Sequence, residues 1–546
     1  MNKSLLLVML GVGLAGQASG QNPAAPAASG GPATRFAAAI TTDEIRRDLS
    51  ELASDAYQGR ESGKPGQAKA ADYLTRQLQQ LGLSGPLGGS SAYQQPFGIA
   101  STTPTGPGTM QVGTATFASP QDFVSFGAAT LPATSAPADP VFMGFGIETE
   151  KYNDYAGRPD VRGRDVIVLQ GEPNNGLGRY LFSGSKQDSE WSSVFRKAAL
   201  ARDKGARSLT VVTYATPSAF QKLTKPVQPE LAHPTYFLTA PVVQPDDNTY
   251  RQEVPPGYIT TTITHGPLGA ALLGTTLADL WRYDKESYKL GHPPTGFQPV
   301  AFRVAMPHKR EEVTTTNVLG LLEGTDKKAE LLVISAHYDH LGTRHDTIYH
   351  GADDGGSGPA AVLALARAFT AAKAAGQGPR RSILFLLDSG EEQGLLGSEY
   401  YTGHPVFPLS STVADLNIDM LGRTDKAHAG KPNYLYLLGS DRLSPELHTL
   451  SEDANVQYAR LRLDYKYNAP REPEHLYYRS DHYNFARNGV LGIVYTDGLH
   501  PDYHRATDDL SKIEFDKLTE RARLVFFTAW ELANRDARPA VSAPKP

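Results

Sequence analysis

The chain has 546 residues, of which 40% are hydrophobic and 20% are charged. Domains usually contain roughly 100–200 residues, so this length predicts at least two of them, and the composition excludes a largely disordered chain. The formal net charge is -5, and no basic block indicates nucleic acid or an anionic membrane surface as a partner. The sequence contains no cysteine, so a metal site would have to use nitrogen and oxygen ligands.

Residues 1–20 have the three-part layout of a secretory signal peptide. Lys3 precedes an apolar run, which is followed by the small residues Ala18-Ser19-Gly20. The run is too short to span a bilayer, so we expect cleavage, no stable membrane insertion afterwards, and a secreted or periplasmic protein. A retained membrane anchor is the alternative. Residues 21–35 are mostly Pro, Ala, Gly and Ser, which predicts a disordered linker.

The elements expected in residues 36–265 fall into two groups. Apolar spacing predicts helices over 42–52 and 71–81, and we assign 36–120 to the first part of the main domain. Within 121–265, the patterns predict strands at 141–147, 165–170 and 208–213 and a helix around 191–199. Strands alternating with a helix, without a catalytic cluster, predict a small inserted α/β domain.

The remaining elements predict that 266–535 completes the main domain. A helical pattern covers 266–283, and two edge strands at 299–305 and 315–323 are expected to lead back into the main sheet. Apolar runs at 331–336, 382–388 and 413–419 predict central strands, and helices are expected over 360–375 and around 518–532. The fold class is therefore α/β, with a mixed central sheet flanked by helices, and residues 536–546 are expected to be a disordered tail.

Each of the three central strands has acidic or imidazole side chains at its C-terminal end. His337 ends the first, Glu391 and Glu392 follow the second, and Asp419 ends the third, while Asp354 lies in a glycine-rich loop after the first. Ligands bind beyond the carboxyl ends of strands in open α/β sheets, so these side chains are expected to form one site.

Histidine and carboxylate groups in this number are typical of a hydrolase site with two metal ions. Such a site needs a shared ligand between the ions and a base for the attacking water. The candidate ligands suit zinc, and they are His337, Asp354, Glu392, Asp419 and His504. Glu391 stands beside a ligand and is free to act as the base. A serine hydrolase is not supported, because the Gly-x-Ser-x-Gly motif does not occur in the sequence.

The motifs that carry these residues resemble those of the co-catalytic zinc exopeptidase family. They are AHYDHLG, GADDGGSG, DSGEEQGLLGS, LNIDM and HPDYHRATDDL, within a resemblance that covers about Thr315 to Leu532. The family includes bacterial secreted aminopeptidases, glutamate carboxypeptidases and the transferrin receptor. Within the insertion, GFGIETEKYNDYAGRPDVRGRDVIVLQGEP and KAALARDKGARSLTVV resemble the protease-associated domain that many of these enzymes carry.

The resemblance implies two zinc ions and a role for each ligand. His337 and Asp419 would be terminal ligands of one ion, Glu392 and His504 of the other, and Asp354 would bridge the two. The neighbour Asp353 is set aside only because the family's bridging residue is the fourth of its Gly-x-x-Asp run; the residue types alone do not separate the two. His500 is an alternative to His504. The resemblance also implies a cis peptide bond after Asp354.

Three further residues receive roles from the resemblance. Glu391 would be the general base that moves a proton from water to the leaving amine. Tyr503 would donate a hydrogen bond to the tetrahedral intermediate. Asp339 would hold the His337 imidazole in one tautomer. Three other histidines near the first motif, His340, His345 and His350, are expected in a solvated loop.

We therefore expect a secreted zinc aminopeptidase that removes residues from peptide or protein N-termini, with the substrate amine against Glu391 and Asp419. A carboxypeptidase or dipeptidase with the same metal ions is the first alternative, with an arginine, Arg423, Arg471 or Arg479, to hold a terminal carboxylate. A metal-free, receptor-like binding protein and a single-zinc enzyme that cyclises N-terminal glutamine are further alternatives, and both would require departures from the ligand set. The sequence indicates no particular oligomeric state.

Overall fold

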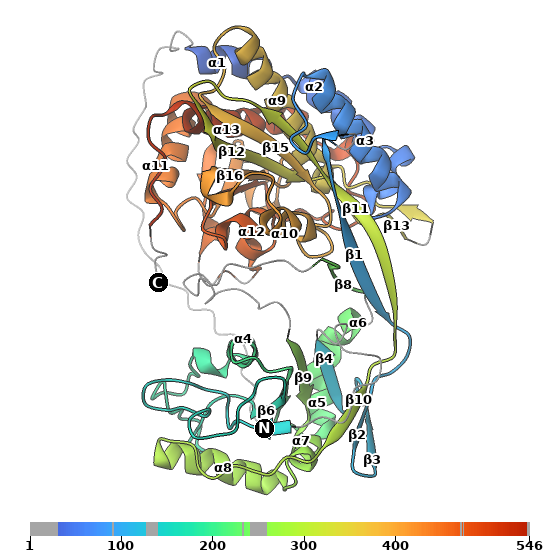
Figure 1. Ribbon diagram of the computed structural model, residues 1–546, viewed down its shortest axis with the longest axis vertical. Helices are drawn as coiled ribbons and strands as arrows, with labels where there is room; N and C mark the ends of the chain where they lie inside the picture. The colour runs from blue at the N-terminus through green and yellow to red at the C-terminus, as the bar shows by residue number, and fades with distance from the viewer. Residues whose placement is uncertain are drawn as a thin grey trace.

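The computed structural model describes residues 31–89, 92–126, 140–231, 234–240, 259–344, 346–469, 472 and 474–542. A larger and a smaller α/β body lie at the two ends of a pair of long strands (Figure 1). The predicted signal peptide lies outside the described residues, as does most of the predicted linker. Helix α1 (Pro32–Ala37) begins inside the range predicted as linker, so the ordered chain starts earlier than expected.

The larger body is built on a mixed nine-stranded sheet, which confirms the predicted fold class. In spatial order its strands are β18 (Arg462–Asp464), β17 (Tyr434–Leu438), β19 (Leu491–Thr496), β16 (Thr412–Ile418), β12 (Lys327–His337), β15 (Arg381–Asp388), β11 (His308–Leu322), β1 (Gln94–Pro104) and β8 (Thr235–Leu238). The four strands β19, β16, β12 and β15 run parallel to one another, while β11, β1 and β8 continue the sheet in antiparallel pairing.

The three strands predicted at 331–336, 382–388 and 413–419 are confirmed as β12, β15 and β16, at the centre of the sheet. All residues of β15 and β16 are buried, as expected for parallel strands covered by helices on both faces, which read as continuous apolar runs. In the register of β12 and β15, His337 is paired with Asp388. The carboxyl ends of the three strands therefore meet at one edge, where the predicted site lies.

Helices cover both faces of this sheet (Figure 1). One face packs against a large core formed mainly by α1, α2 (Thr42–Leu52), α3 (Pro65–Gln80), α9 (Gly358–Ala374), α11 (Pro445–Ala454) and α13 (Phe515–Asn534). The other face carries α10 (Leu396–Gly403) and α12 (His482–Ala486), with a smaller core that includes Tyr401 and Phe485. A two-stranded ladder, β13 (Thr343–Arg344) and β14 (Thr347–Ile348), follows β12.

The smaller body contains a five-stranded sheet, a three-stranded sheet and several helices. The five-stranded sheet has the order β4 (Phe123–Phe126), β9 (Thr260–Thr264), β7 (Ser208–Val212), β6 (Asp165–Leu169) and β5 (Pro140–Phe142). The three-stranded sheet consists of β10 (Phe302–Ala305), β2 (Thr109–Val112) and β3 (Ala115–Ala118). The helices are α4 (Val194–Asp203), α5 (Pro217–Thr224), α6 (Gln228–Leu231), α7 (Gly266–Leu272) and α8 (Leu277–Leu290).

The smaller body extends beyond the predicted limits of 121 and 265. Its core joins Met110, Leu268, Leu280 and Phe302, which lie on both sides of that range. The helix expected over 266–283 is two helices, because Thr276 caps a new helix start with a capping box. The strand expected at 299–305 belongs to the smaller body, because β10 pairs with β2 and not with the main sheet.

The two long strands that connect the bodies are β1 and β11. They pair along their length, from Gln94 opposite Val318 to Pro104 opposite His308. β11 was expected at the sheet edge, but it lies inside, between β15 and β1. The edge is instead β8, a strand from the predicted insertion that pairs with β1. The main sheet thus includes a strand from the predicted insertion.

Part of the predicted tail is described. Residues 536–542 have no helix or strand, but the Ser542 amide donates a hydrogen bond to the Leu443 carbonyl at 2.7 Å. In the described part of the chain, helices fall short of the length and apolar character needed to cross a membrane.

Candidate metal centre

The five predicted ligands lie together at the carboxyl edge of the main sheet. His337 ends β12, Glu392 follows β15 and Asp419 follows β16 directly. Asp354 lies in the turn between Asp353 and Ser357 that leads into α9, and His504 lies in the loop after β19. His504 has a φ of 55°, an uncommon conformation for a non-glycine residue that often marks functional sites.

The two oxygens of Asp354 face two different histidines. Asp354 Oδ1 lies 3.4 Å from His337 Nε2, which is also 3.4 Å from Asp419 Oδ1. Asp354 Oδ2 lies 3.3 Å from His504 Nε2, which is 3.1 Å from Glu392 Oε2. The atoms therefore form two sets that share one carboxylate, each set with a histidine and a second carboxylate.

These separations fit metal ligands. Zinc binds nitrogen and oxygen at about 2.0–2.1 Å, so ligand atoms at two corners of a tetrahedron lie about 3.3 Å apart. The four distances of 3.1 to 3.4 Å agree with that value. The donor chemistry agrees as well, because imidazole and carboxylate suit zinc. The residues thus fit two zinc ions, with Asp354 between them.

The charge of the site also fits divalent cations. Asp419 and Glu392 act to raise the pKa of Glu391, and Asp354 acts to raise that of Glu392, so several carboxylates lie close together here. Burial would lower the pKa of His504, but its contacts with Asp354 and Glu392 raise it to about 10. Several buried carboxylates in one place are unfavourable unless positive charge is nearby, and two divalent ions would supply it.

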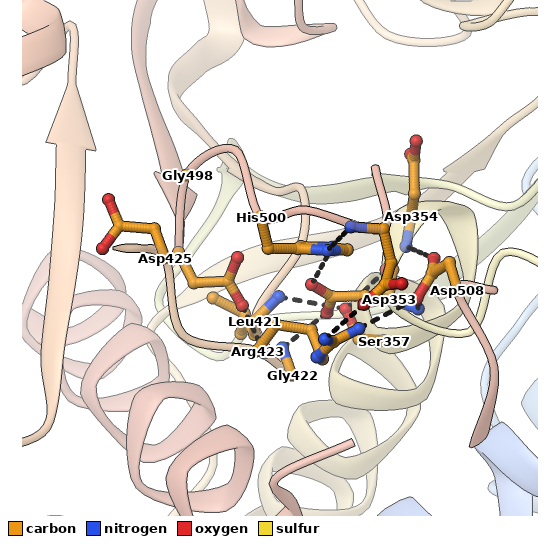
Figure 2. Close-up of polar contacts among 12 residues, drawn as sticks. Asp353, Asp354, Ser357, Leu421, Gly422, Arg423, Asp425, Gly498, His500 and Asp508 are labelled. Atoms are coloured by element: carbon orange, nitrogen blue, oxygen red, sulfur yellow. Dashed lines mark hydrogen bonds and ion pairs between the residues drawn. The ribbon is translucent and has the colours of Figure 1, made fainter. Parts of the chain in front are cut away.

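The structure distinguishes Asp354 from Asp353 and His504 from His500, two choices that the sequence left open. Asp353 points away from the ligands: its Oδ1 accepts the Gly422 amide at 2.6 Å, and its Oδ2 lies 3.3 Å from His500 Nε2 (Figure 2). His500 is thus a partner of Asp353, and His504 faces the ligand set.

The expected cis bond after Asp354 is not formed. The cis bond of the described chain is Ser119-Pro120, and Gly355, with φ of 77°, turns the chain after Asp354.

His340 is a site residue that the sequence interpretation missed. The prediction of a solvated loop is wrong for it, because its side chain is fully buried and its Nδ1 lies 2.6 Å from Glu392 Oε1. His340, Asp354 and Glu392 also form a group with ligand atoms within 4.8 Å of one another. A separation of 2.6 Å is a hydrogen bond, much shorter than the edge of a zinc tetrahedron. We therefore interpret His340 as a partner that orients Glu392.

The other two histidines of that segment are His350 and His345. His350 Nε2 lies 2.8 Å from the exposed carboxylate of Asp55, away from the ligands. His345 lies outside the described residues. Position in the sequence distinguishes His340 only weakly from these two: it stands three residues after a strand-end ligand, where the chain is still buried.

Asp339 lies near His337 without the predicted hydrogen bond. Its Oδ1 is 3.9 Å from His337 Nδ1, which exceeds hydrogen-bond distance. Asp339 instead accepts hydrogen bonds from Ser62 Oγ at 2.9 Å and from the Glu391 amide at 3.3 Å. In this structure it therefore supports the backbone of Glu391, and its role toward the imidazole stays a prediction.

A pocket opens beside the ligands, with Asp354, Glu391, Asp419 and Tyr503 in its wall. Burial, reinforced by Asp419 and Glu392, raises the pKa of Glu391 well above its usual value, against the opposing effect of His337. Glu391 thus lies in the pocket wall with a perturbed pKa, which is common among groups at functional sites. The rest of the wall is largely apolar and includes Met420, Leu438, Leu476, Val494 and Leu499.

Tyr503 is held by two contacts. Its ring stacks on the His504 ring with centroids 3.9 Å apart, and Arg479 Nη2 donates to its hydroxyl oxygen at 3.1 Å. Because the oxygen accepts from Arg479, the hydroxyl proton remains available for a second partner. Tyr503 and Arg479 both line the pocket, so that partner can be a bound molecule.

Residues 317–529 match the sequence profile of peptidase family M28. This segment belongs to peptidase family M28. All five predicted ligands and Glu391 lie within the M28 segment, so the family expected from the motifs is confirmed.

Curated relatives match parts of the chain. The mouse protein "Aminopeptidase NAALADL1" is 35% identical over 156 residues, which are 27% of this chain and 20% of the relative. "Aminopeptidase YwaD" of Bacillus subtilis is 26% identical over 230 residues, 41% of this chain and 46% of the relative. The matches thus span less than half the length of these two relatives.

A solved aminopeptidase from Aneurinibacillus sp. strain AM-1 is also similar to the chain. It has 17% sequence identity and a TM-score of 0.49, covering 94% of this chain and 98% of the other.

Proposed function

We propose that this protein is a zinc-dependent aminopeptidase with two metal ions, which removes residues from the N-termini of peptides. The observation that carries the proposal is the pair of ligand sets that share Asp354. His337 and Asp419 would hold one ion, and His504 and Glu392 the other. When bound, the zinc ions would supply Lewis-acid polarisation of the scissile carbonyl and help to ionise a water molecule.

The protein's own residues would then move protons. Glu391 accepts a proton from the water that attacks the carbonyl carbon, and burial, which raises its pKa, favours the form that holds this proton. As the C–N bond breaks, Glu391 returns the proton to the leaving nitrogen. Tyr503 keeps its proton and donates a hydrogen bond from its hydroxyl to the carbonyl oxygen, where negative charge develops.

The walls of the pocket favour a substrate with a free amine and an apolar first side chain. Glu391 and Asp419 present carboxylates to one side of the pocket, and an ammonium group is attracted to them. Met420, Leu438 and Leu476 offer apolar surface to the side chain of the first residue.

A carboxypeptidase or dipeptidase is the second candidate, and one observation favours it. Arg479 lines the pocket, and an arginine can bind a carboxylate through two hydrogen bonds. Arg423 is less suited to this role, because it is engaged with Asp502 at 2.7 Å. The third arginine considered, Arg471, lies outside the described residues.

Metal content and a matched set of substrates test the proposal. We would measure zinc per chain and the hydrolysis of aminoacyl anilides, their N-acetylated forms, and acetylated dipeptides with a free carboxylate. We expect two zinc ions and cleavage only of substrates with a free amine. In Glu391→Gln, zinc should remain while kcat falls about 10²–10⁴-fold, whereas the exposed Glu323→Gln should match the wild type.

The alternatives give different results in the same experiment. If the protein cleaved only the acetylated dipeptides, its function would be that of a carboxypeptidase and not of an aminopeptidase. A protein that binds no zinc and shows no turnover after zinc is added would be a receptor-like binding protein. Export from the cytoplasm and a protease-associated role for the smaller body stay predictions, to be tested by N-terminal sequencing of the mature protein and by binding studies.

A further inference from the structure

Asp508, four residues after His504, binds the turn that carries Asp354. Its carboxylate accepts the amides of both Asp353 and Asp354 at 3.1 to 3.2 Å, and its backbone oxygen accepts the Ala352 amide at 3.2 Å. Three consecutive N–H groups of one turn thus donate to a single residue of another loop. Asp508 is fully buried, so water does not compete for these contacts.

A second set of contacts ties the same turn to the loop after β16, which carries Asp419 at its start (Figure 2). Asp353 Oδ1 accepts the Gly422 amide at 2.6 Å, and a Cβ atom added to Gly422 would lie 2.8 Å from that oxygen. On the same loop, Arg423 Nη2 lies 2.7 Å from Asp502 Oδ2 and its Nη1 lies 3.8 Å from Asp508 Oδ1.

The ligands differ in how firmly their own elements hold them. His337 ends the buried C-terminal part of a central strand and has a side-chain exposure of 1%. His504 stands in a loop, has a side-chain exposure of 40% and has a left-handed backbone conformation. Its position relative to Asp354 therefore depends on contacts between the loop and the turn, and Asp508 makes the largest number of these.

We propose that Asp508 is a positioning residue that sets Asp354 and His504 at the separation required by the second metal ion. The inference rests on the proposed function, because it presupposes that the ion binds there. Groups that hold metal ligands in place change metal affinity about 10–100-fold when they are removed. The effect should be larger for the ion of His504, because Asp508 links both His504 and Asp354, whereas the other ion shares only Asp354 with that contact and also has His337, which ends a central strand.

The test is a zinc titration of the metal-free protein against a chelator that reports free zinc. The wild type should bind two equivalents tightly. Asp508→Ala should bind the second equivalent about 10–100-fold more weakly than the wild type and the first with a smaller loss of affinity. Activity should return at high zinc concentration, with half-saturation shifted by the same factor and an unchanged KM.

The neighbour Asp509 provides a matched control. It has the same charge and lies in the same loop, but among the described residues its carboxylate accepts from Ser511, at 2.6 to 2.8 Å, and not from the turn of Asp354. Asp509→Ala should therefore titrate like the wild type. Asp508→Asn keeps an acceptor oxygen without the charge, so an intermediate loss is expected. If thermal unfolding of the metal-free protein shows that Asp508→Ala does not fold, the zinc titration of Asp508→Asn tests the proposal in its place.

The outcomes separate the two proposals. A folded Asp508 variant that binds both equivalents like the wild type, or that loses both equally, would overturn the positioning role while leaving the proposed function intact. A wild-type protein that binds fewer than two zinc ions would overturn the proposed function and the positioning role with it.

Discussion

Replacing Arg60 by methionine should destabilise the larger body strongly. The Arg60 guanidinium is fully buried and donates to four backbone oxygens, those of Leu52, Tyr338, His350 and Gly351, at 2.5 to 2.8 Å. Tyr338 follows the ligand His337, and Gly351 begins the segment that leads to Asp354. Methionine retains much of the aliphatic volume but provides no donor, so all four oxygens would be left without their partner.

The expected loss in the free energy of unfolding is the difference between two opposing contributions. A hydrogen bond to a charged group contributes about 1.5–3 kcal/mol, so four bonds at the lower value contribute about 6 kcal/mol. Burial lowers the pKa of Arg60 from 12.5 to about 10, against the opposing effect of nearby carboxylates. That difference corresponds to about 3 kcal/mol of unfavourable burial, which the substitution relieves. We therefore expect Arg60→Met to lower the free energy of unfolding by about 3 kcal/mol.

Denaturant unfolding of the metal-free protein, followed by circular dichroism and tryptophan fluorescence, measures this difference. Arg303→Met is the control, because Arg303 is exposed on β10 of the smaller body; surface changes of this kind alter stability by about 0.5 kcal/mol or less. A loss below about 1 kcal/mol in Arg60→Met would refute the argument that these four contacts hold the segments around the site.

Three further substitutions give measurable outcomes. Tyr503→Phe should lower kcat about 10²–10³-fold with unchanged zinc content, and steady-state kinetics that show a change in KM alone would contradict the donor role. Gly355→Ala should destabilise the protein by more than about 1 kcal/mol, because Gly355 has φ of 77° and a Cβ atom would lie 2.2 Å from the Asp339 carbonyl oxygen; equal urea midpoints for variant and wild type would contradict this. Burial raises the pKa of Asp284 from 3.8 to about 7, against hydrogen bonds from Asn174, so its contribution to stability is present at low pH and lost as pH rises through 7. Asp284→Asn should therefore lose less stability than the wild type between pH 4 and pH 8 in urea unfolding, and parallel pH profiles would refute this assignment.

The centre of the fold could be predicted because its signals are local. Continuous apolar runs predicted β12, β15 and β16, and parallel strands must end at one edge. The gathering of His337, Glu392 and Asp419 at that edge follows from the order of strands alone. The positions of Asp354 and His504 required the motif resemblance as well, because each has a neighbour of the same residue type within four positions.

Other features depend on long-range packing that leaves no local pattern. His340 is buried against the turn at Gly351, where an added Cβ atom would lie 2.4 Å from the His340 ring, and its own segment indicates this burial only weakly. The smaller body exceeds its predicted limits because Met110 and Phe302, far apart in the sequence, share its core. Asp508 is separated from its partners by 154 and 155 residues, so only the folded chain shows that contact.

The pairing of β1 with β11 also determines whether the smaller body can be removed from the chain without disturbing the main sheet. The chain leaves the main sheet after Pro104 and returns at His308, and these two residues are paired, with the Thr105 amide 2.9 Å from the Pro307 carbonyl oxygen just beyond them. Topologically the smaller body occupies the loop of one β-hairpin, and a short turn could replace it without stretching either strand. A variant shortened in this way would also lose β8 and expose the edge of β1. Adding a charged residue to that edge would help to protect it against aggregation.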